Sequence, residues 1–183
     1  MEPTAQDIVD EARQCPSPNH DERPAGAEIS LLVIHNISLP PGQFGGPWID
    51  NLFQNQLDPD ADPYFQDICG LRVAAHLLIR RDGELVQYVP LSKRAWHAGQ
   101  SEFQGCSNCN DFSIGIELEG ADDVAYADVQ YQTLVRVASQ IMQHYPTITA
   151  ERIAGHSDIA PGRKTDPGPA FDWSYFRQLL ATA

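Results

Sequence analysis

The segment Gly155–Gly168, GHSDIAPGRKTDPG, carries a histidine, a lysine and an aspartate whose types suit metal chemistry. His156 follows a short apolar run, and Asp166 comes ten residues later, directly before Pro167. Because a proline restricts the residue before it to extended conformations, we expect Asp166 on a stiff loop. An imidazole, a carboxylate and the cation of Lys164 suit a zinc site with an open coordination position. The alternative interpretation is a polar surface loop rich in glycine and proline.

A second histidine stands at the end of a predicted central strand. Leu31–His35 (LLVIH) is an almost unbroken apolar run, as expected for a strand that is covered on both faces. The run ends in His35 and Asn36, and α/β sheets commonly bind ligands at the carboxyl ends of their strands. His35 is therefore a second candidate metal ligand.

An acidic side chain stands in the middle of another predicted strand, Ser113–Glu119 (SIGIELE), in which apolar residues alternate with glycine and glutamate. Gly115 has no side chain and leaves open space beside Glu117, which favours a functional carboxylate at that position. Glu119, near the end of the strand, is predicted to be solvated.

Together these residues would form a hydrolytic zinc site. Ligation by His35, His156 and Asp166 would leave zinc a fourth position for water, whose pKa such an ion lowers to roughly 7. Glu117 would accept the proton of that water and return it to the leaving amine. Lys164, with the metal, would stabilise the tetrahedral oxyanion.

The identity of the carboxylate ligand stays open at this point. Asp158 lies two residues after His156 and competes with Asp166. No HExxH motif places two ligands on one helix, so spacing alone does not choose between them.

The other patterns predict the α/β class, with a central mixed β-sheet flanked by helices. Apolar residues recur at helical spacing along Ala127–Tyr145, which predicts a long helix packed on the sheet. Asp172 is predicted to cap a last helix. Asp82-Gly83 predicts a two-residue type I′ turn between strands Ala75–Arg81 and Glu84–Pro90. The shorter predicted elements are the helices Thr4–Arg13, Trp48–Phe53 and Tyr64–Leu71 and the strands Lys93–Ala98 and Arg152–Gly155.

Two further histidines lie near the predicted hairpin. His76 is interpreted as a hydrogen-bonded core residue. For His97, beside Trp96, a place in a pocket wall and a structural role both remain open.

The four cysteines, Cys15, Cys69, Cys106 and Cys109, offer one pair with CxxC spacing. That pair matches half a structural zinc site or a redox motif, but no second CxxC accompanies it. We predict reduced thiols without a function.

Size and charge narrow the class of protein. The 183 residues are expected to form a single domain, with a core at about 28–181 and an N-terminal extension at 1–27. The net charge of −13 argues against binding to nucleic acid, membranes and anionic wall polymers, and favours a small diffusible substrate.

No run approaches the ~20 apolar residues of a membrane span. The acidic N-terminus does not resemble a signal peptide, so we expect a cytoplasmic protein. We also expect it to act as a monomer, although no sequence pattern indicates the oligomeric state.

Five segments closely resemble the AmpD-type 1,6-anhydro-N-acetylmuramyl-L-alanine amidases. They are LLVIHNISLPPGQFGGPWID, AHLLIRRDGELVQYVP, RAWHAG, CNDFSIGIELEG and GHSDIAPGRKTDPGPAFDW. The resemblance covers roughly residues 14–177 and extends to the zinc amidase superfamily that includes phage T7-type lysozyme and the peptidoglycan recognition proteins. It implies a mixed β-sheet packed between helices.

The resemblance also implies roles for individual residues. Zinc would be held by His35, His156 and Asp166, with Glu117 as general base and Lys164 as transition-state stabiliser. An aspartate here replaces a cysteine of many relatives, which supports Asp166 over Asp158. Three residues, Tyr64, Trp96 and Leu118, would line the sugar pocket, and two, Asn36 and Arg72, would meet the peptide.

The reaction implied by the resemblance is cleavage of the amide between the lactyl group of anhydro-N-acetylmuramic acid and L-Ala of the stem peptide. In the family this reaction belongs to cytoplasmic wall recycling and restrains inducible β-lactamase expression.

One departure from the family concerns peptide recognition. Relatives tend to carry an arginine before CND that contacts a carboxylate of the peptide, where this chain has Cys106-Ser107-Asn108. We therefore predict weaker dependence on the distal carboxylates of the peptide.

Two alternatives remain beside the implied function. One is a broader amidase acting on intact wall, which the acidic composition and the missing export signal disfavour. The other is a non-catalytic muropeptide-binding module, which the retention of all three ligands, Glu117 and Lys164 disfavours.

Overall fold

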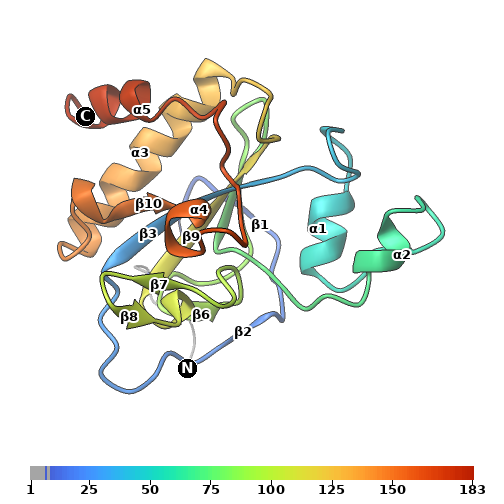
Figure 1. Ribbon diagram of the computed structural model, residues 1–183, viewed down its shortest axis with the longest axis horizontal. Helices are drawn as coiled ribbons and strands as arrows, with labels where there is room; N and C mark the ends of the chain where they lie inside the picture. Colours follow the sequence, from blue (N-terminus) through green and yellow to red (C-terminus); the bar gives the residue numbers. More distant parts are fainter. Residues whose placement is uncertain (1–6, 8) are drawn as a thin grey trace.

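A mixed β-sheet runs through the centre of the fold, as predicted (Figure 1). The structure is a computed structural model that describes residue 7 and residues 9–183. Within this part of the chain the sheet has six strands in the order β1-β5-β4-β9-β3-β10. The pair β4 and β5 is antiparallel, and the other neighbours are parallel. The strands are β1 (Arg13–Gln14), β3 (Leu31–Ile37), β4 (Leu77–Ile79), β5 (Leu85–Gln87), β9 (Ser113–Glu119) and β10 (Ile153–Gly155).

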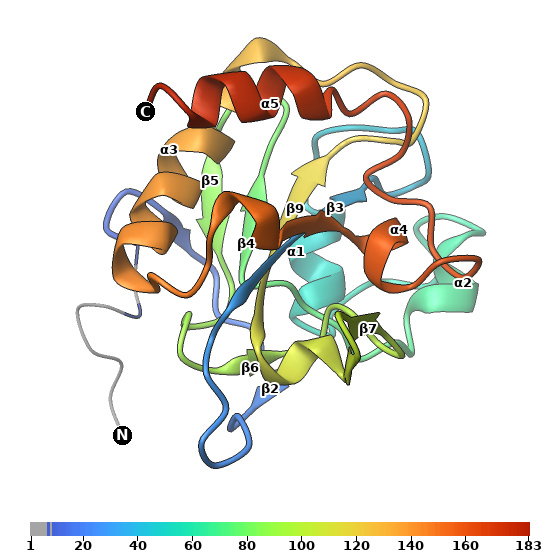
Figure 2. The same cartoon turned by 60° about the vertical axis from the view of Figure 1, so that its left-hand side comes forward.

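Helices flank this sheet, and two small sheets lie beside it (Figure 2). The α-helices are α1 (Trp48–Phe53), α2 (Phe65–Ile68), α3 (Asp128–His144), α4 (His156–Ile159) and α5 (Trp173–Leu180). The short 3-10 helices are η1 (Cys109–Asp111) and η2 (Ala150–Arg152). The small sheets pair β2 (His20–Asp21) with β6 (Arg94–Ala95) and β7 (Glu102–Phe103) with β8 (Cys106–Ser107).

The period-2 alternation of strands separates the core from the side chains that could do chemistry. Ile114, Ile116 and Leu118 of β9 join the core that α3 and α5 cover. Because successive side chains of a strand point to opposite faces, Glu117 of β9 lies on the other face, as does His35 of β3. The candidate site residues on β3 and β9 therefore share one face of the sheet.

The predicted long helix is confirmed as α3. Its apolar stripe, including Leu134, Ala138 and Ile141, is buried against the sheet. The predicted cap of the last helix is confirmed as well, because Oδ1 of Asp172 accepts a hydrogen bond from the Tyr175 N–H at 2.9 Å. These elements depend on local periodicity and capping, which the sequence displays directly.

The predicted two-residue turn of the hairpin is wrong. Leu77–Ile79 and Leu85–Gln87 do pair, but the Gly83 N–H donates to the Arg80 carbonyl at 2.9 Å, and Arg80 and Glu84 close the loop. Gly83 has φ +87°, whereas Asp82 has no positive φ. A type I′ turn needs positive φ at both central residues. The connection is therefore a three-residue loop with glycine in the left-handed position.

Two further expectations for short elements are wrong. Part of the predicted helix Thr4–Arg13 lies outside the described residues, but residues 10–12 form a turn and bend and Arg13 begins β1. The predicted strand Lys93–Ala98 is confined to Arg94–Ala95 and pairs with β2 rather than with the hairpin. In both cases a pairing with a distant segment decided the local structure, which weak local periodicity cannot reveal.

The structure also shows the state of the four cysteines and the character of the helices. Cys15, Cys69, Cys106 and Cys109 are free, as predicted. Among residues 7 and 9–183, no helix combines the length and the apolar character needed to cross a bilayer.

Candidate metal centre and cavity

Strand register brings three of the candidate site residues together. His35 on β3 is the direct partner of Glu117 on β9. Gly155, the last residue of β10, pairs with Ile34, so the next residue, His156, emerges beside His35. These strands are parallel, and their carboxyl ends meet at one edge of the sheet.

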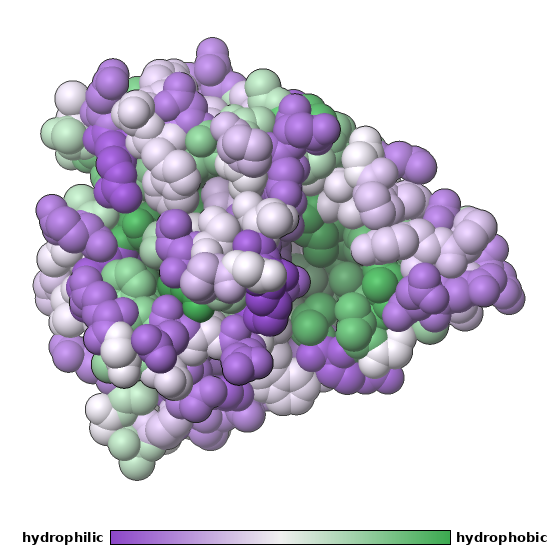
Figure 3. All heavy atoms as spheres, viewed as in Figure 1, coloured by the Kyte–Doolittle hydropathy of each residue, from purple (hydrophilic) through white to green (hydrophobic). Residues whose placement is uncertain are grey.

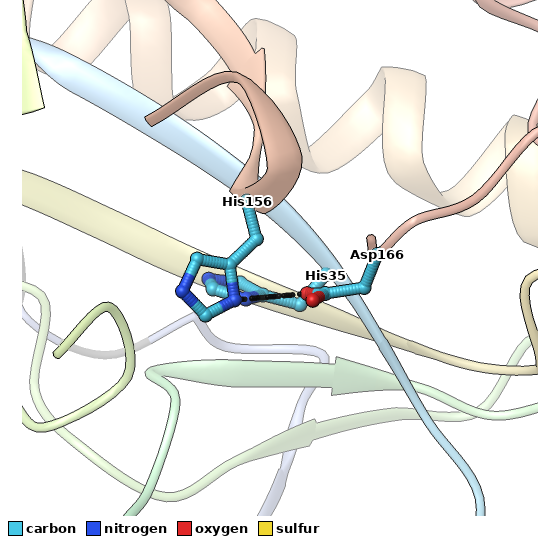
Figure 4. Close-up of side chains that lie close together, drawn as sticks. All are labelled: His35, His156 and Asp166. Carbon is cyan, nitrogen blue, oxygen red and sulfur yellow. Dashed lines mark hydrogen bonds and ion pairs between the residues drawn. The ribbon is translucent and has the colours of Figure 1, made fainter. Parts of the chain in front are cut away.

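The loop after α4 returns Asp166 to the two histidines (Figure 4). The backbone N–H of Ser157 donates to the Asp166 carbonyl at 2.9 Å, which ties the loop back to α4. Oδ2 of Asp166 lies 3.1 Å from Nδ1 of His35 and 3.0 Å from Nδ1 of His156, and the two Nδ1 atoms are 3.0 Å apart. One ligand atom from each of these residues thus lies within 4.8 Å of the others.

The ionisation of the cluster suits a divalent cation. Burial lowers the pKa of His35 to about 4, although the close contact with Asp166 opposes the shift. Burial raises the pKa of Asp166, but the close contacts of its carboxylate with His156 and His35 outweigh this effect and hold that pKa below its usual value. The cluster therefore combines a neutral imidazole with an ionised carboxylate. Two imidazoles and a carboxylate are a donor set that fits zinc with an open fourth position.

The other candidate carboxylate, Asp158, forms a hydrogen bond at the start of α4 instead. Its Oδ2 accepts a hydrogen bond from the Gly155 N–H at 2.7 Å at the start of α4. This contact satisfies a free donor at the helix N-terminus. Asp166, not Asp158, is the carboxylate that reaches both histidines.

Glu117 is the second acidic group of the site. The residue is 9% exposed, and Oε2 of its carboxylate is buried without a hydrogen-bond partner among the described residues. Burial, reinforced by Asp166 and opposed by Lys164, raises the pKa of Glu117 well above its usual value. An unpaired buried carboxylate is costly, so Glu117 is a group that a ligand or a reacting proton would satisfy.

A cavity of about 360 Å³ opens onto these groups. On one side it is lined by His35, Glu117, His156, Lys164 and Asp166, and on the other by apolar residues of α1, α2 and the loops around them. Figure 3 shows this hollow between the main body and the α1–α2 segment, with hydrophobic residues on its floor. The cavity therefore has ionisable side chains on one wall and apolar side chains on the other, a combination that is common in ligand-binding cavities.

The predicted substrate-contacting residues are only partly at this cavity. Tyr64, Trp96 and Asn36 line it, and Nε1 of Trp96 is buried without a hydrogen-bond partner among the described residues. Arg72 is exposed, lies outside the lining, and donates to the carbonyls of Cys69 and Leu71.

The prediction for the Leu118 side chain is wrong. That side chain is 1% exposed and packs in the α3 core, opposite to Glu117. Adjacent residues of a strand face opposite sides, so Glu117 and Leu118 cannot both face the cavity.

The prediction that Glu119 is solvated is also wrong, since its side chain is 2% exposed. Its carboxylate accepts hydrogen bonds from the N–H groups of Gly45 at 2.6 Å and Arg81 at 3.1 Å, and lies 3.6 Å from the Arg80 guanidinium. Glu119 thereby ties the loop before α1 to the sheet. All seven residues of β9 are buried, and the alternating sequence of this strand does not reveal that both of its faces are covered.

Sequence reasoning left His97 open and missed Asn110. Nδ1 of His97 lies 2.9 Å from Nε2 of His35, and Nε2 of His97 lies 3.1 Å from Oγ of Ser113. Oδ1 of Asn110 accepts hydrogen bonds from the N–H groups of His97 and Ala98. The expectation for His76 is confirmed, because its buried Nδ1 accepts a hydrogen bond from the Gly115 N–H at 3.0 Å.

Gly115 is expected to tolerate no side chain, because a Cβ there would lie 2.5 Å from Nδ1 of His97. Gly115→Ala should lower the free energy of unfolding by about 1–3 kcal/mol, as overpacking of a core does. Denaturant titration measures this loss. Gly70→Ala is the matched control, because a Cβ there would meet no described atom within 4 Å. Equal unfolding midpoints for the two variants would contradict the close packing of His97 on β9.

Comparisons with known proteins agree with this fold and show the family of the chain. Residues 25–169 match the family model for N-acetylmuramoyl-L-alanine amidase, and the chain belongs to this family of enzymes. It is 64% identical over 171 residues to the 1,6-anhydro-N-acetylmuramyl-L-alanine amidase AmpD of Salmonella typhimurium strain SL1344, covering 93% of this chain and 91% of that protein.

Solved structures extend the comparison. The crystal structure of a selenomethionine derivative of AmpD superposes with a TM-score of 0.93 at 60% identity, covering 98% of this chain and 99% of the other. The complex of the Escherichia coli amidase AmiD with the substrate anhydro-N-acetylmuramic acid-L-Ala-D-γ-Glu-L-Lys gives 0.61 at 31% identity, covering 86% and 60%.

Proposed function

We propose that this chain is a zinc-dependent amidase that cleaves the bond between the lactyl group of 1,6-anhydro-N-acetylmuramic acid and L-Ala of the stem peptide. The observation that carries the proposal is the convergence of His35, His156 and Asp166 at the wall of the cavity that also contains Glu117. The 64% identity to an amidase named for this substrate supports the choice of bond.

His35, His156 and Asp166 would hold the ion through Nδ1, Nδ1 and Oδ2, the atoms that face one another. When bound, zinc supplies the Lewis acidity that activates a water nucleophile and polarises a carbonyl group. The protein contributes the placement of these ligands on two strand ends and one loop, beside an open cavity.

Glu117 is proposed as the general base. Its buried Oε2, which has no partner in the described part of the chain, can accept a proton from the attacking water and return it to the leaving amine. Its raised pKa favours holding that proton between the two steps. Lys164, an exposed residue that lines the same cavity, would donate to the oxyanion of the tetrahedral intermediate.

The apolar wall and the polar groups beside it would bind the sugar and the peptide. Tyr64 and Trp96 would offer aromatic surface to the sugar, and Nε1–H of Trp96, which has no partner within residues 7 and 9–183, would donate to it. Asn36 commits its amide N–H groups to Oδ1 of Asp122 at 2.8 Å and the Pro167 carbonyl at 3.0 Å. Its side-chain oxygen therefore remains to accept a peptide N–H.

We place the reaction in the cytoplasmic recycling of wall fragments, carried out by a monomer on small muropeptides. The net charge of −13 supports this setting, because it disfavours adsorption to anionic wall polymers. In a host with inducible β-lactamase, removal of these muropeptides would restrain its expression.

The function is tested by incubating the purified protein with anhydro and reducing muropeptides, with and without a chelator, and identifying the products by mass spectrometry. We expect release of the intact peptide from the anhydro substrate and loss of that release with chelator. Binding of muropeptides without cleavage would show a non-catalytic module instead. Release from intact wall at a similar rate would show a broader amidase.

Peptide recognition is expected to depend weakly on the distal carboxylates. The segment that lacks the family's arginine, Cys106-Ser107-Asn108, includes strand β8, whose two residues are exposed. A charged hydrogen bond contributes about 1.5–3 kcal/mol. Because this chain lacks the arginine that would make such a bond to the peptide carboxylate, neutralising that carboxylate should remove little binding energy. Amidation of a tripeptide substrate should therefore lower kcat/KM by less than about tenfold, measured against the free acid. A larger loss on amidation would show that another cation has taken over the contact.

A further inference from the structure

Both metal-site histidines make their second hydrogen bond to one short segment. Nε2 of His35 lies 2.9 Å from Nδ1 of His97, and Nε2 of His156 lies 3.0 Å from the carbonyl oxygen of Ala98. His97 and Ala98 are consecutive, whereas His35 and His156 are 121 residues apart in sequence. The two imidazoles thus depend on a common support.

His35, His97 and Ser113 form a hydrogen-bonded series, and the direction of the hydrogen bonds at His97 follows from Ser113 at its end. The Ser113 hydroxyl donates to the Cys109 carbonyl at 2.6 Å, and a hydroxyl has a single proton to give. Oγ of Ser113 must therefore accept from Nε2–H of His97, 3.1 Å away. In a neutral His97 this leaves Nδ1 as an acceptor, which receives Nε2–H of His35.

The same logic settles His156. Nη2 of Arg163 lies 3.4 Å from Nε2 of His156, but it donates to the carbonyl oxygens of Ala98 and Gln100, each at 2.6 Å. A carbonyl oxygen can only accept, so Nε2 of His156 carries its proton toward Ala98. Nδ1 of each neutral imidazole then presents a lone pair to the space beside Asp166. The support selects, for both histidines, the tautomer that a metal ion needs.

The segment itself is held by a buried amide. Asn110 is 8% exposed, and its Oδ1 accepts from the N–H groups of His97 at 3.2 Å and Ala98 at 2.8 Å. Arg163 also donates to the Ala98 carbonyl, at 2.6 Å. The His97 ring rests on Gly115, where no side chain intervenes.

We propose that His97–Ala98 is a shared positioning element of the metal centre, with His97 setting the tautomer of His35, Ala98 that of His156, and Asn110 holding the segment in place. The inference rests on the proposed zinc site and concerns residues outside its ligand set. Loss of such outer partners typically lowers metal affinity about 10–100-fold.

The first test uses the unaltered protein. Nitrogen-15 correlation spectra of the zinc-loaded protein should show His35 and His156 with Nδ1 bound to metal and a protonated Nε2. A spectrum in which either histidine binds through Nε2 would overturn the proposal.

The second test compares variants of His97 by competition with a chromophoric zinc chelator. His97→Leu removes the acceptor for His35 and should weaken zinc binding 10–100-fold. His97→Asn retains a side-chain oxygen near the position of Nδ1 and should recover most of that affinity. Asn110→Ala should also weaken zinc binding, because it releases both supports together.

The matched control is His76→Leu, which removes a neighbouring, fully buried histidine whose ring centroid is 5.7 Å from that of the partly buried His97. Thermal unfolding of the metal-free proteins shows how far each variant is destabilised. We expect His76→Leu to lose stability but keep zinc affinity within about threefold. Unchanged zinc affinity in folded His97→Leu and Asn110→Ala would refute the positioning role alone. An unaltered protein that binds no zinc would refute the proposed function itself.

Discussion

Glu117→Gln is expected to lower kcat by about 10²–10⁴-fold while the protein still binds one zinc ion per chain. General acid–base groups contribute rate factors of this size. The glutamine side chain has nearly the same shape as glutamate but cannot accept and return a proton. Because Glu117 is not one of the three clustered ligands, its replacement leaves the metal site intact. Single-turnover kinetics on an anhydro-muropeptide, together with metal analysis, measures both effects.

Glu119→Gln is the matched control, since it changes a second buried carboxylate on the same strand. Glu119 is satisfied by two backbone N–H groups and an arginine. Its loss should cost about 1–3 kcal/mol of stability, because a buried donor is left without its acceptor. We expect kcat to fall by less than tenfold. If Glu119→Gln lost as much activity as Glu117→Gln, the assignment of the base to Glu117 would fail.

The free energy of unfolding should also respond differently to the replacement of Glu117 and of Glu119. Burial raises the pKa of Glu117 in the folded, metal-free protein above its value in the unfolded chain. The unaltered protein therefore loses stability as pH rises from the unfolded-state pKa toward the folded-state pKa. Glutamine does not ionise and escapes this loss. At neutral pH, metal-free Glu117→Gln should unfold at no lower denaturant concentration than the unaltered protein.

Asp166→Asn is expected to remove zinc and, with it, nearly all hydrolysis. The carboxylate is the one anionic member of the described ligand cluster and contacts both histidines. Replacing it with a neutral amide should weaken zinc binding by more than the ~10–100-fold that follows the loss of an outer partner. Zinc content after dialysis and turnover at saturating substrate measure the two losses.

Asp158→Asn provides the control for this second prediction. The amide oxygen of asparagine can still accept from the Gly155 N–H, so the start of α4 should be preserved. We expect full zinc content and nearly unchanged activity. The reverse result, with metal lost from Asp158→Asn and kept in Asp166→Asn, would make Asp158 the ligand. Full activity of the unaltered protein after complete removal of metal would end the zinc proposal.

Local patterns were enough to predict the elements that carry the site. The apolar run before His35, the alternation around Glu117, the stripe of α3 and the cap at Asp172 all depend on neighbours within a few residues. Backbone geometry imposes these periods on any strand or helix, whatever surrounds it. The same locality explains the errors, since β1 and β6 exist only through pairing with distant strands.

The sequence by itself determined the residue types available for chemistry and the strands that present them. Tertiary structure decided which residues meet: His35 beside His156, Asp166 rather than Asp158 at the cluster, Leu118 in the core and Glu119 buried. The physical reason is strand register, because a shift of one residue between β3, β9 and β10 would turn each side chain to the opposite face. That register is set by packing between segments far apart in the chain, which no local pattern records.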